Sequence, residues 1–253
     1  MKYGVCVGNS AEQIRIAAEA GFDYVEAGFA VLAESGEEEF ESFCAALGEN
    51  HIRCEAVNCF IPGRLPVVGS SVDDQALSEY IESGMKRAER VGLEIIVFGS
   101  GGARKMPEDW LYADTVHQLV HFLREIVSPL ARKYGITVVV EPLSETNTIT
   151  TVREGAMLTA FADTEPVKLL CDLYHMEKVG DTPASMTGLS GMIRHSHIAE
   201  PDRRRYPSPS DEYDYRPFLD ALKEAGCSRC SVEASTNDFA ADAVSAVNLL
   251  KSL

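Results

Sequence analysis

The chain has 253 residues, of which 45% are hydrophobic and 25% are charged. This is the balance of an ordinary globular protein, so the composition excludes a disordered or fibrous chain. Lys and Arg total 23 against 39 Asp and Glu, which gives a formal net charge of −16 at pH 7. A negative charge of this size repels nucleic-acid backbones and anionic lipid, so we expect no nucleic acid and no membrane as partner.

The cysteine pattern and the first residues predict a cytoplasmic location. Seven scattered cysteines do not form a disulfide framework, and a reducing compartment is the simpler interpretation. The lone CxxC of Cys227 and Cys230 is a weak zinc or redox signal, and we interpret both as small hydrophobic residues. The start of the chain does not have the pattern of a signal peptide, and no apolar run approaches the ~18 residues of a membrane span.

Eight short runs rich in Val, Ile and Leu are predicted to be strands. Such runs are typical of strands that helices cover on both faces. In chain order they are Tyr3–Val7, Tyr24–Ala27, Arg53–Asn58, Glu94–Phe98, Thr137–Glu141, Lys168–Asp172, Met192–Ile198 and Ser228–Glu233.

Segments with helical spacing of apolar residues lie between these strands. The first opens with a Ser cap and ends at Gly21, as a helix should. In chain order the predicted helices are Ser10–Ala20, Gly36–Glu49, Asp73–Val91, Asp109–Tyr134, Thr151–Ala162, Thr182–Ser190, Tyr215–Ala225 and Asn237–Ser252.

The alternation of strands and helices predicts an α/β protein with one domain, residues 1–253, folded as a single (β/α)8 TIM barrel. No Pro-, Gly- or Ser-rich linker divides the chain. A doubly wound open sheet is the alternative. Its phosphate signature is missing, because the turn Val7–Ser10 after the first strand contains only one glycine.

Four candidate metal ligands stand at the ends of the last four predicted strands. The fifth strand ends in Glu141, the sixth in Asp172 and the eighth in Glu233, and His197 lies near the end of the seventh. In a barrel these positions meet at the carboxyl-terminal face, where active sites are built. Three carboxylates and one imidazole suit Mn²⁺, Mg²⁺ or Co²⁺ better than a thiolate-rich zinc site does.

Each of these residues also has a purely structural interpretation. A single acid at a strand end is more often a helix cap or an ion-pair partner. Four such residues at equivalent strand ends are harder to attribute to chance, and we therefore favour the metal site. Of His195 and His197, we expect only one to face the barrel axis and the other to be a packed or surface histidine.

The motifs around these residues resemble those of the xylose isomerase-like TIM barrel superfamily. Within it the chain most resembles the sugar phosphate isomerase/epimerase group, which includes D-tagatose 3-epimerase and hydroxypyruvate isomerase. The motifs that carry the resemblance are Glu141-Pro-Leu, Cys171-Asp-Leu-Tyr-His-Met176, His195-Ser-His-Ile-Ala-Glu200, Ser231-Val-Glu233, Asn58-Cys-Phe-Ile-Pro-Gly63 and Phe98-Gly-Ser-Gly-Gly-Ala-Arg104.

The resemblance implies that Glu141, Asp172, His197 and Glu233 bind one divalent metal ion. Mn²⁺ is the preferred ion, and Mg²⁺, Co²⁺ and Zn²⁺ are alternatives. Glu141 and Glu233 would flank the substrate as the catalytic acid/base pair.

The resemblance also implies substrate-binding roles for His175, Arg203 and Glu145. Arg204 and Arg205 adjoin Arg203, so the match to the family's arginine can shift by one position. In the epimerases a second glutamate follows the Glu-Pro-Leu motif of the fifth strand after a longer loop. Glu145 comes sooner after Glu141, so it aligns with that second glutamate only across a gap.

The implied activity is isomerisation or epimerisation of a ketose or related keto sugar. A metal ion that polarises the carbonyl would stabilise the enediolate formed when the neighbouring carbon loses its proton. The partner would be a small-molecule sugar or sugar phosphate, and family members often form homo-oligomers.

Three other functions stay open. The first is a lyase or dehydratase that acts on a keto-inositol or keto-glycoside through the same enolate chemistry. The second is a phosphodiesterase, since endonuclease IV shares the fold, although six histidines and the negative charge argue against it. The third is a sugar-binding subunit without catalysis.

The glycine-rich stretch Phe98–Arg104 has two interpretations. With Lys105 it could hold a phosphate or carboxylate of the substrate. It could instead be a turn whose glycines allow positive φ. We favour the turn, because no Walker-type pattern is present.

Overall fold

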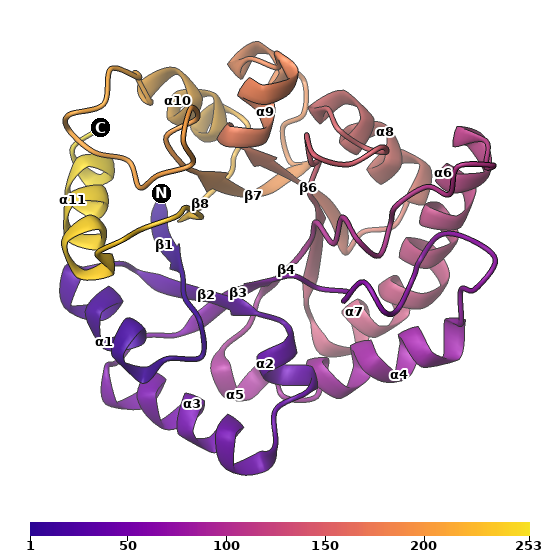
Figure 1. Ribbon diagram of the computed structural model, residues 1–253, viewed down its shortest axis with the longest axis horizontal. Coiled ribbons are helices and arrows are strands. Elements are labelled where there is room, and N and C mark those ends of the chain that lie inside the picture. The colour runs from indigo at the N-terminus through magenta and orange to yellow at the C-terminus, as the bar shows by residue number, and fades with distance from the viewer.

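Eight parallel strands pair in chain order and close into a barrel in the computed structural model, which describes residues 1–253. The closure joins β1 to β8, with Tyr3 opposite Cys230. Figure 1 shows the strands as an inner ring surrounded by helices. The strands are β1 (Lys2–Cys6), β2 (Tyr24–Gly28), β3 (Cys54–Asn58), β4 (Ile95–Phe98), β5 (Thr137–Val140), β6 (Val167–Asp172), β7 (Ile193–Ile198) and β8 (Arg229–Val232). The prediction of a (β/α)8 TIM barrel is confirmed.

The helices follow the strands around the outside of the barrel. They are α1 (Ala11–Ala20), α2 (Ala30–Ala33), α3 (Glu37–Glu49), α4 (Asp74–Met85), α5 (Ala88–Val91), α6 (Tyr112–His121), α7 (Ser128–Tyr134), α8 (Val152–Ala162), α9 (Leu173–Val179), α10 (Arg216–Glu224) and α11 (Phe239–Ser252).

Local sequence signals fix several of the helix ends. Ser10 caps α1 by accepting a hydrogen bond from the backbone N–H of Gln13, and Gly21 ends this helix with φ +97°. Thr151 and Glu154 form a reciprocal capping box at the start of α8.

The helix predicted over Asp73–Val91 is wrong as a single element. The structure divides it into α4 and α5, and Arg87 at the break donates hydrogen bonds to the carbonyl oxygens of Leu32 and Ser35. These contacts tie the break to the end of α2, a short helix that periodicity did not predict.

Two further predicted helices are interrupted. The stretch Asp109–Tyr134 becomes α6, a π-helical turn over Phe122–Val127, and α7. Pro129 has no N–H to bond the carbonyl four residues earlier, and the wider turn before it accommodates that loss. The stretch Thr182–Ser190 forms only a 3₁₀ turn over Pro183–Met186, because the backbone is already extended at Thr187, with ψ 129°, and Gly188 follows with φ +82°.

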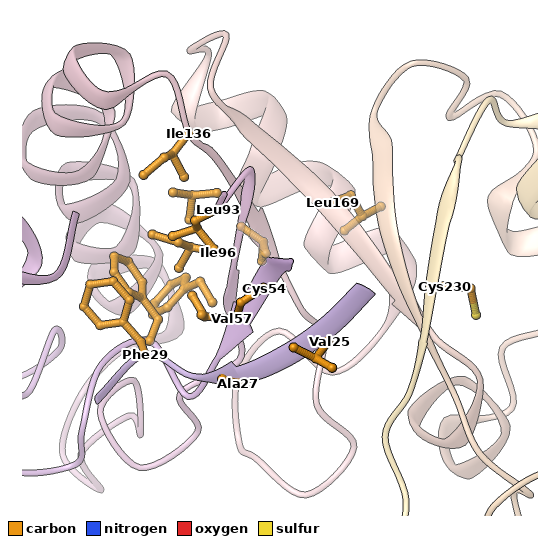
Figure 2. Packing of buried hydrophobic residues seen from close by; sticks show 14 of the residues in the cluster. Val25, Ala27, Phe29, Cys54, Val57, Leu93, Ile96, Ile136, Leu169 and Cys230 are labelled. Atoms are coloured by element: carbon orange, nitrogen blue, oxygen red, sulfur yellow. The ribbon is translucent and has the colours of Figure 1, made fainter. Parts of the chain in front are cut away.

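The strands alternate between two hydrophobic environments. Outward-facing residues such as Val25 and Val57 belong to the main core between strands and helices, where Figure 2 shows Phe29, Val57 and Ile96 close together. The inward-facing residues form a smaller apolar layer inside the barrel, composed of Tyr24, Ala56, Ile95, Val97, Val139 and Leu170. Two residues further along the chain, the same face of several strands carries the polar residues of the site, as Glu26 follows Tyr24 and Asp172 follows Leu170.

Tyr24 fills the barrel interior below those polar residues. A Cβ at Gly4 of β1 would collide with the Tyr24 ring, so only glycine leaves room for it. The Tyr24 hydroxyl lies 2.9 Å from Ser231 Oγ on β8, across the barrel. This packing forms a floor under the site.

The cysteines and helices add two further observations. All seven cysteines are free, and Cys227 and Cys230 are buried, in accord with a packing role.

None of the helices combines the length and the apolar character needed to span a lipid bilayer.

Candidate active site

The four strand-end residues selected from the sequence converge at one point of the barrel mouth. Glu141 directly follows β5, Asp172 ends β6, His197 lies in β7 and Glu233 follows β8. One ligand atom from each lies within 4.8 Å of the others. Glu141, Asp172 and His197 are buried, whereas Glu233 is partly accessible from the mouth.

His197 lies at the centre of this group. Its Nδ1 is 3.1 Å from Glu141 Oε1, 3.5 Å from Glu233 Oε2 and 3.9 Å from Asp172 Oδ2. Its other nitrogen, Nε2, is 2.9 Å from Oε1 of Glu26 on β2. The imidazole therefore presents one nitrogen to three carboxylates.

The electrostatics of the cluster reflect crowded negative charge. Burial, followed by the charge of Glu141, raises the pKa of Asp172 to about 7, and burial also raises the pKa of Glu141. Although burial raises the pKa of Glu233, His197 and Arg204 outweigh it and lower this pKa to about 2.

This donor set fits a divalent cation. Three carboxylates that face one imidazole nitrogen supply oxygen and nitrogen ligands of the kind that Mn²⁺, Mg²⁺ and Co²⁺ accept. A positive ion among them would also offset the burial and the repulsion from Glu141 that raise the pKa of Asp172.

A cavity of about 1010 Å³ opens above the cluster. This volume lies in the range of small-molecule sites. Glu141 and Glu233 belong to its lining, as do two of the predicted substrate-binding residues, His175 and Glu145.

His175 is buried at the cavity wall and has a defined tautomer. The backbone N–H of Ser144 lies 3.3 Å from His175 Nδ1, and Ser144 Oγ lies 2.8 Å from the same atom. A backbone N–H can only donate, so Nδ1 accepts and the proton of a neutral ring is on Nε2. Burial, then the charge of Arg204, lowers the pKa of His175 to about 4, which keeps the ring neutral at pH 7.

Of the three successive arginines Arg203, Arg204 and Arg205, only Arg204 lines the cavity. Its Nη2 donates a hydrogen bond to Glu233 Oε2 at 2.6 Å, and its guanidinium lies 4.8 Å from the centre of the Tyr174 ring. The side chain of Arg203 is exposed and does not belong to the lining. Arg204 has φ +51°, and this local turn of the backbone decides which side chain enters the site.

Glu145 lies on the same wall as an exposed side chain. It accepts a hydrogen bond from the Tyr174 hydroxyl at 3.3 Å. The ring of the same Tyr174 makes a cation–π contact with the Arg204 guanidinium. The shortened loop after Glu141 therefore still brings a second carboxylate to the cavity.

The expectation that only one of His195 and His197 faces the barrel axis is wrong. Side chains two residues apart on a strand share a face, and both imidazoles contact Glu26 inside the barrel. Glu26 itself was missed in the sequence. The signal was available, because an acidic residue in the middle of the apolar strand Tyr24–Gly28 is costly unless it is paired.

The glycine-rich stretch after β4 is a tight wall of the site. Arg104 is fully buried and donates to the backbone oxygen of Glu141 at 2.7 Å, so its guanidinium faces the protein and not the cavity. A Cβ at Gly99 would collide with Glu141 Oε2. The only positive φ in this turn belongs to Ser100, so Gly99 is needed for space and not for backbone freedom.

The family model of the xylose isomerase-like TIM barrel matches residues 14–253. The chain belongs to this family. No curated protein matches this xylose isomerase-like barrel by sequence.

Solved structures of similar fold cover essentially the whole chain. The 3-keto-D-glucoside 4-epimerase of E. coli aligns over 100% of both chains, with a TM-score of 0.84 and 20% identity. The D-psicose 3-epimerase of Clostridium cellulolyticum H10, solved with D-tagatose, has a TM-score of 0.85 and 16% identity over 100% of this chain and 99% of its own. A family 2 AP endonuclease of Brucella melitensis has a TM-score of 0.78 and 20% identity over 100% and 99%. At these identities the likeness is one of fold.

Proposed function

We propose that this xylose isomerase-like barrel is a divalent-metal-dependent sugar isomerase or epimerase that acts on a keto sugar. The observation that carries the proposal is the convergence of Glu141, Asp172, His197 and Glu233, of which Glu141 and Glu233 line the cavity at the barrel mouth. Two proteins of similar fold are epimerases of keto sugars, which agrees with this choice.

The four converging residues would hold the ion, for which we propose Mn²⁺. When bound, a divalent ion supplies Lewis-acid polarisation of a substrate carbonyl. Because Nε2 of His197 faces Glu26, the nitrogen offered to the ion is Nδ1.

Glu141 and Glu233 would move the proton. They follow β5 and β8, which are separated around the barrel, so their carboxylates approach the cavity from different strands. One carboxylate takes the proton from the carbon beside the carbonyl, and the other returns a proton to the opposite face of that carbon. This sequence inverts the carbon, whereas return of the proton to the former carbonyl carbon would interconvert ketose and aldose. Positioned acid/base groups of this kind contribute about 10²–10⁴-fold to rate.

Arg204 and His175 would orient the sugar. The Nε2–H of a neutral His175 can donate to a substrate hydroxyl, and the guanidinium of Arg204 can bond an oxygen while it holds Glu233 in place. Arg203, whose side chain is exposed, is less suited to this role.

A product assay tests the proposal. The Mn²⁺-loaded protein is incubated with ketoses, keto-glycosides, keto-inositols and their phosphates, and products are identified by NMR and mass. A product with the formula of its substrate supports an isomerase or epimerase. A product lighter by one water identifies a lyase, and hydrolysis of an added phosphodiester, bis(4-nitrophenyl) phosphate, identifies a phosphodiesterase. Either of these, or no conversion by protein that binds the ion, overturns the proposal.

A further inference from the structure

Glu26 joins two histidines behind the proposed metal site. Its side chain is fully buried in β2 and reaches across the barrel to β7. Oε1 lies 2.9 Å from Nε2 of His197, and Oε2 lies 2.8 Å from Nε2 of His195. Both oxygens of this carboxylate are therefore used by imidazoles.

The first of these contacts fixes the hydrogen positions on His197. An ionised carboxylate only accepts hydrogen bonds, so the nitrogen that faces it must carry the hydrogen. A protonated His197 donates from both nitrogens, because Nδ1 faces the Glu141 carboxylate. When His197 loses one hydrogen to bind an ion among Glu141, Asp172 and Glu233, the hydrogen lost is the one on Nδ1, and the one that faces Glu26 stays.

The second contact holds the carboxylate itself. His195 is fully buried, and its Nδ1 has no hydrogen-bond partner, so Nε2 makes its polar contacts. Ser231 Oγ lies 3.4 Å from the same nitrogen and is bonded in turn to the Tyr24 hydroxyl. With one imidazole on each oxygen, the Glu26 carboxylate cannot rotate without breaking a buried hydrogen bond.

We propose that Glu26 and His195 are positioning residues that set the metal affinity by holding His197 as an Nδ1 ligand. The inference rests on the proposed metal site and extends it beyond the four ligands. Outer carboxylates that orient a ligating histidine contribute about 10–100-fold to metal affinity in proteins.

The barrel contains a matched control carboxylate. Glu55, on the adjacent strand β3, is also buried, but it is bonded by Lys2 and Arg229 and contacts no histidine. The variant Glu55→Gln removes a buried negative charge without touching the metal site, and it reports what such a loss does to the fold alone.

The test measures Mn²⁺ affinity for the wild-type protein and for Glu26→Gln, His195→Phe and Glu55→Gln, with thermal melts of each metal-free protein. We expect Glu26→Gln to bind Mn²⁺ about 10–100-fold more weakly and His195→Phe to bind it severalfold more weakly. Glu55→Gln should bind Mn²⁺ as the wild type does, even where its melting temperature falls. Wild-type affinity in folded Glu26→Gln would overturn the inference.

A second measurement needs no variant. In the Zn²⁺-loaded protein with ¹⁵N-labelled histidine, NMR locates the ring hydrogen of His197. We expect it on Nε2, and a hydrogen on Nδ1 would overturn the inference even if Glu26→Gln does not fold. If the wild type binds neither ion, the metal site and the proposed function fail together. Binding by the wild type with no effect of Glu26→Gln defeats only the role of Glu26.

Discussion

Arg204 donates a hydrogen bond to Glu233 at 2.6 Å, whereas the Glu141 carboxylate is hydrogen-bonded by His197. The two proposed acid/base residues are therefore not equivalent. Although burial raises the pKa of Glu233, His197 and Arg204 lower it to about 2, while burial raises the pKa of Glu141. In the metal-free protein Glu141 is thus the carboxylate that takes up a proton more readily.

Replacing Arg204 should impair turnover far more than replacing its neighbour. Arg204→Gln removes a charge-assisted hydrogen bond to Glu233, and bonds of this kind contribute about 1.5–3 kcal/mol, so kcat/KM should fall roughly 10–100-fold. Arg203→Gln is the matched control, because the Arg203 side chain is exposed, and its kcat/KM should stay near that of the wild type. Equal losses in the two variants would contradict the assignment.

Glu141→Gln should nearly abolish turnover while the barrel remains folded. The amide keeps the shape of the side chain but cannot accept a proton, so kcat should fall about 10²–10⁴-fold. Glu145→Gln, on the same cavity wall, should lose much less because Glu145 is exposed and lies outside the metal cluster. Steady-state kinetics and circular dichroism of both variants check this, and near-normal turnover in Glu141→Gln would rule out its acid/base role.

A methyl group at Gly99 should displace the Glu141 carboxylate. The added Cβ collides with Glu141 Oε2, the far end of a flexible side chain, so the side chain moves and the fold changes little. We expect Gly99→Ala to lose Mn²⁺ affinity and activity with a small change in melting temperature. Gly63→Ala is the control, since its Cβ would meet only atoms at 3.9 Å in the same cavity wall. Unchanged metal affinity in Gly99→Ala would show that this contact is unimportant.

Much of this site follows from strand periodicity. Glu141 directly follows β5, Asp172 ends β6 and Glu233 directly follows β8, and a hydrophobic run that ends in a carboxylate is visible in the sequence. The position of Arg204 is not visible, because it depends on one positive φ in an irregular loop. Glu26 could have been found by the same periodicity, since it is two residues after Tyr24 on the inner face.

The helical layer was harder to predict than the strands. Apolar periodicity continues through the break between α4 and α5 and through the π-helical turn Phe122–Val127. These interruptions come from tertiary contacts of Arg87 and from the missing N–H of Pro129, which periodicity does not register. They lie outside the barrel and leave the strand-end positions unchanged.

Metal binding should strengthen as the pH rises. The pKa of Asp172 is raised to about 7, first by burial, and that of His197 is raised well above its usual value by Glu26 and Glu233 despite burial. Both groups must lose protons to act as ligands, so the association constant for Mn²⁺ should fall at least about 10-fold per pH unit below pH 7. Mn²⁺ titrations between about pH 5 and pH 7.5 measure this slope. A flat profile would mean that these groups do not bind the ion.

Exchange of solvent deuterium into the substrate tests the central claim most directly. The Mn²⁺-loaded protein is incubated in D₂O with each keto sugar, and mass spectrometry and NMR locate any deuterium. Proton transfer by Glu141 and Glu233 predicts deuterium on the carbon beside the carbonyl of an epimerised ketose. Where an aldose forms instead, the deuterium should be on the carbon that carried the carbonyl of the ketose. It also predicts that Glu141→Gln suppresses this uptake. Conversion of a sugar without deuterium uptake at either carbon would contradict the mechanism.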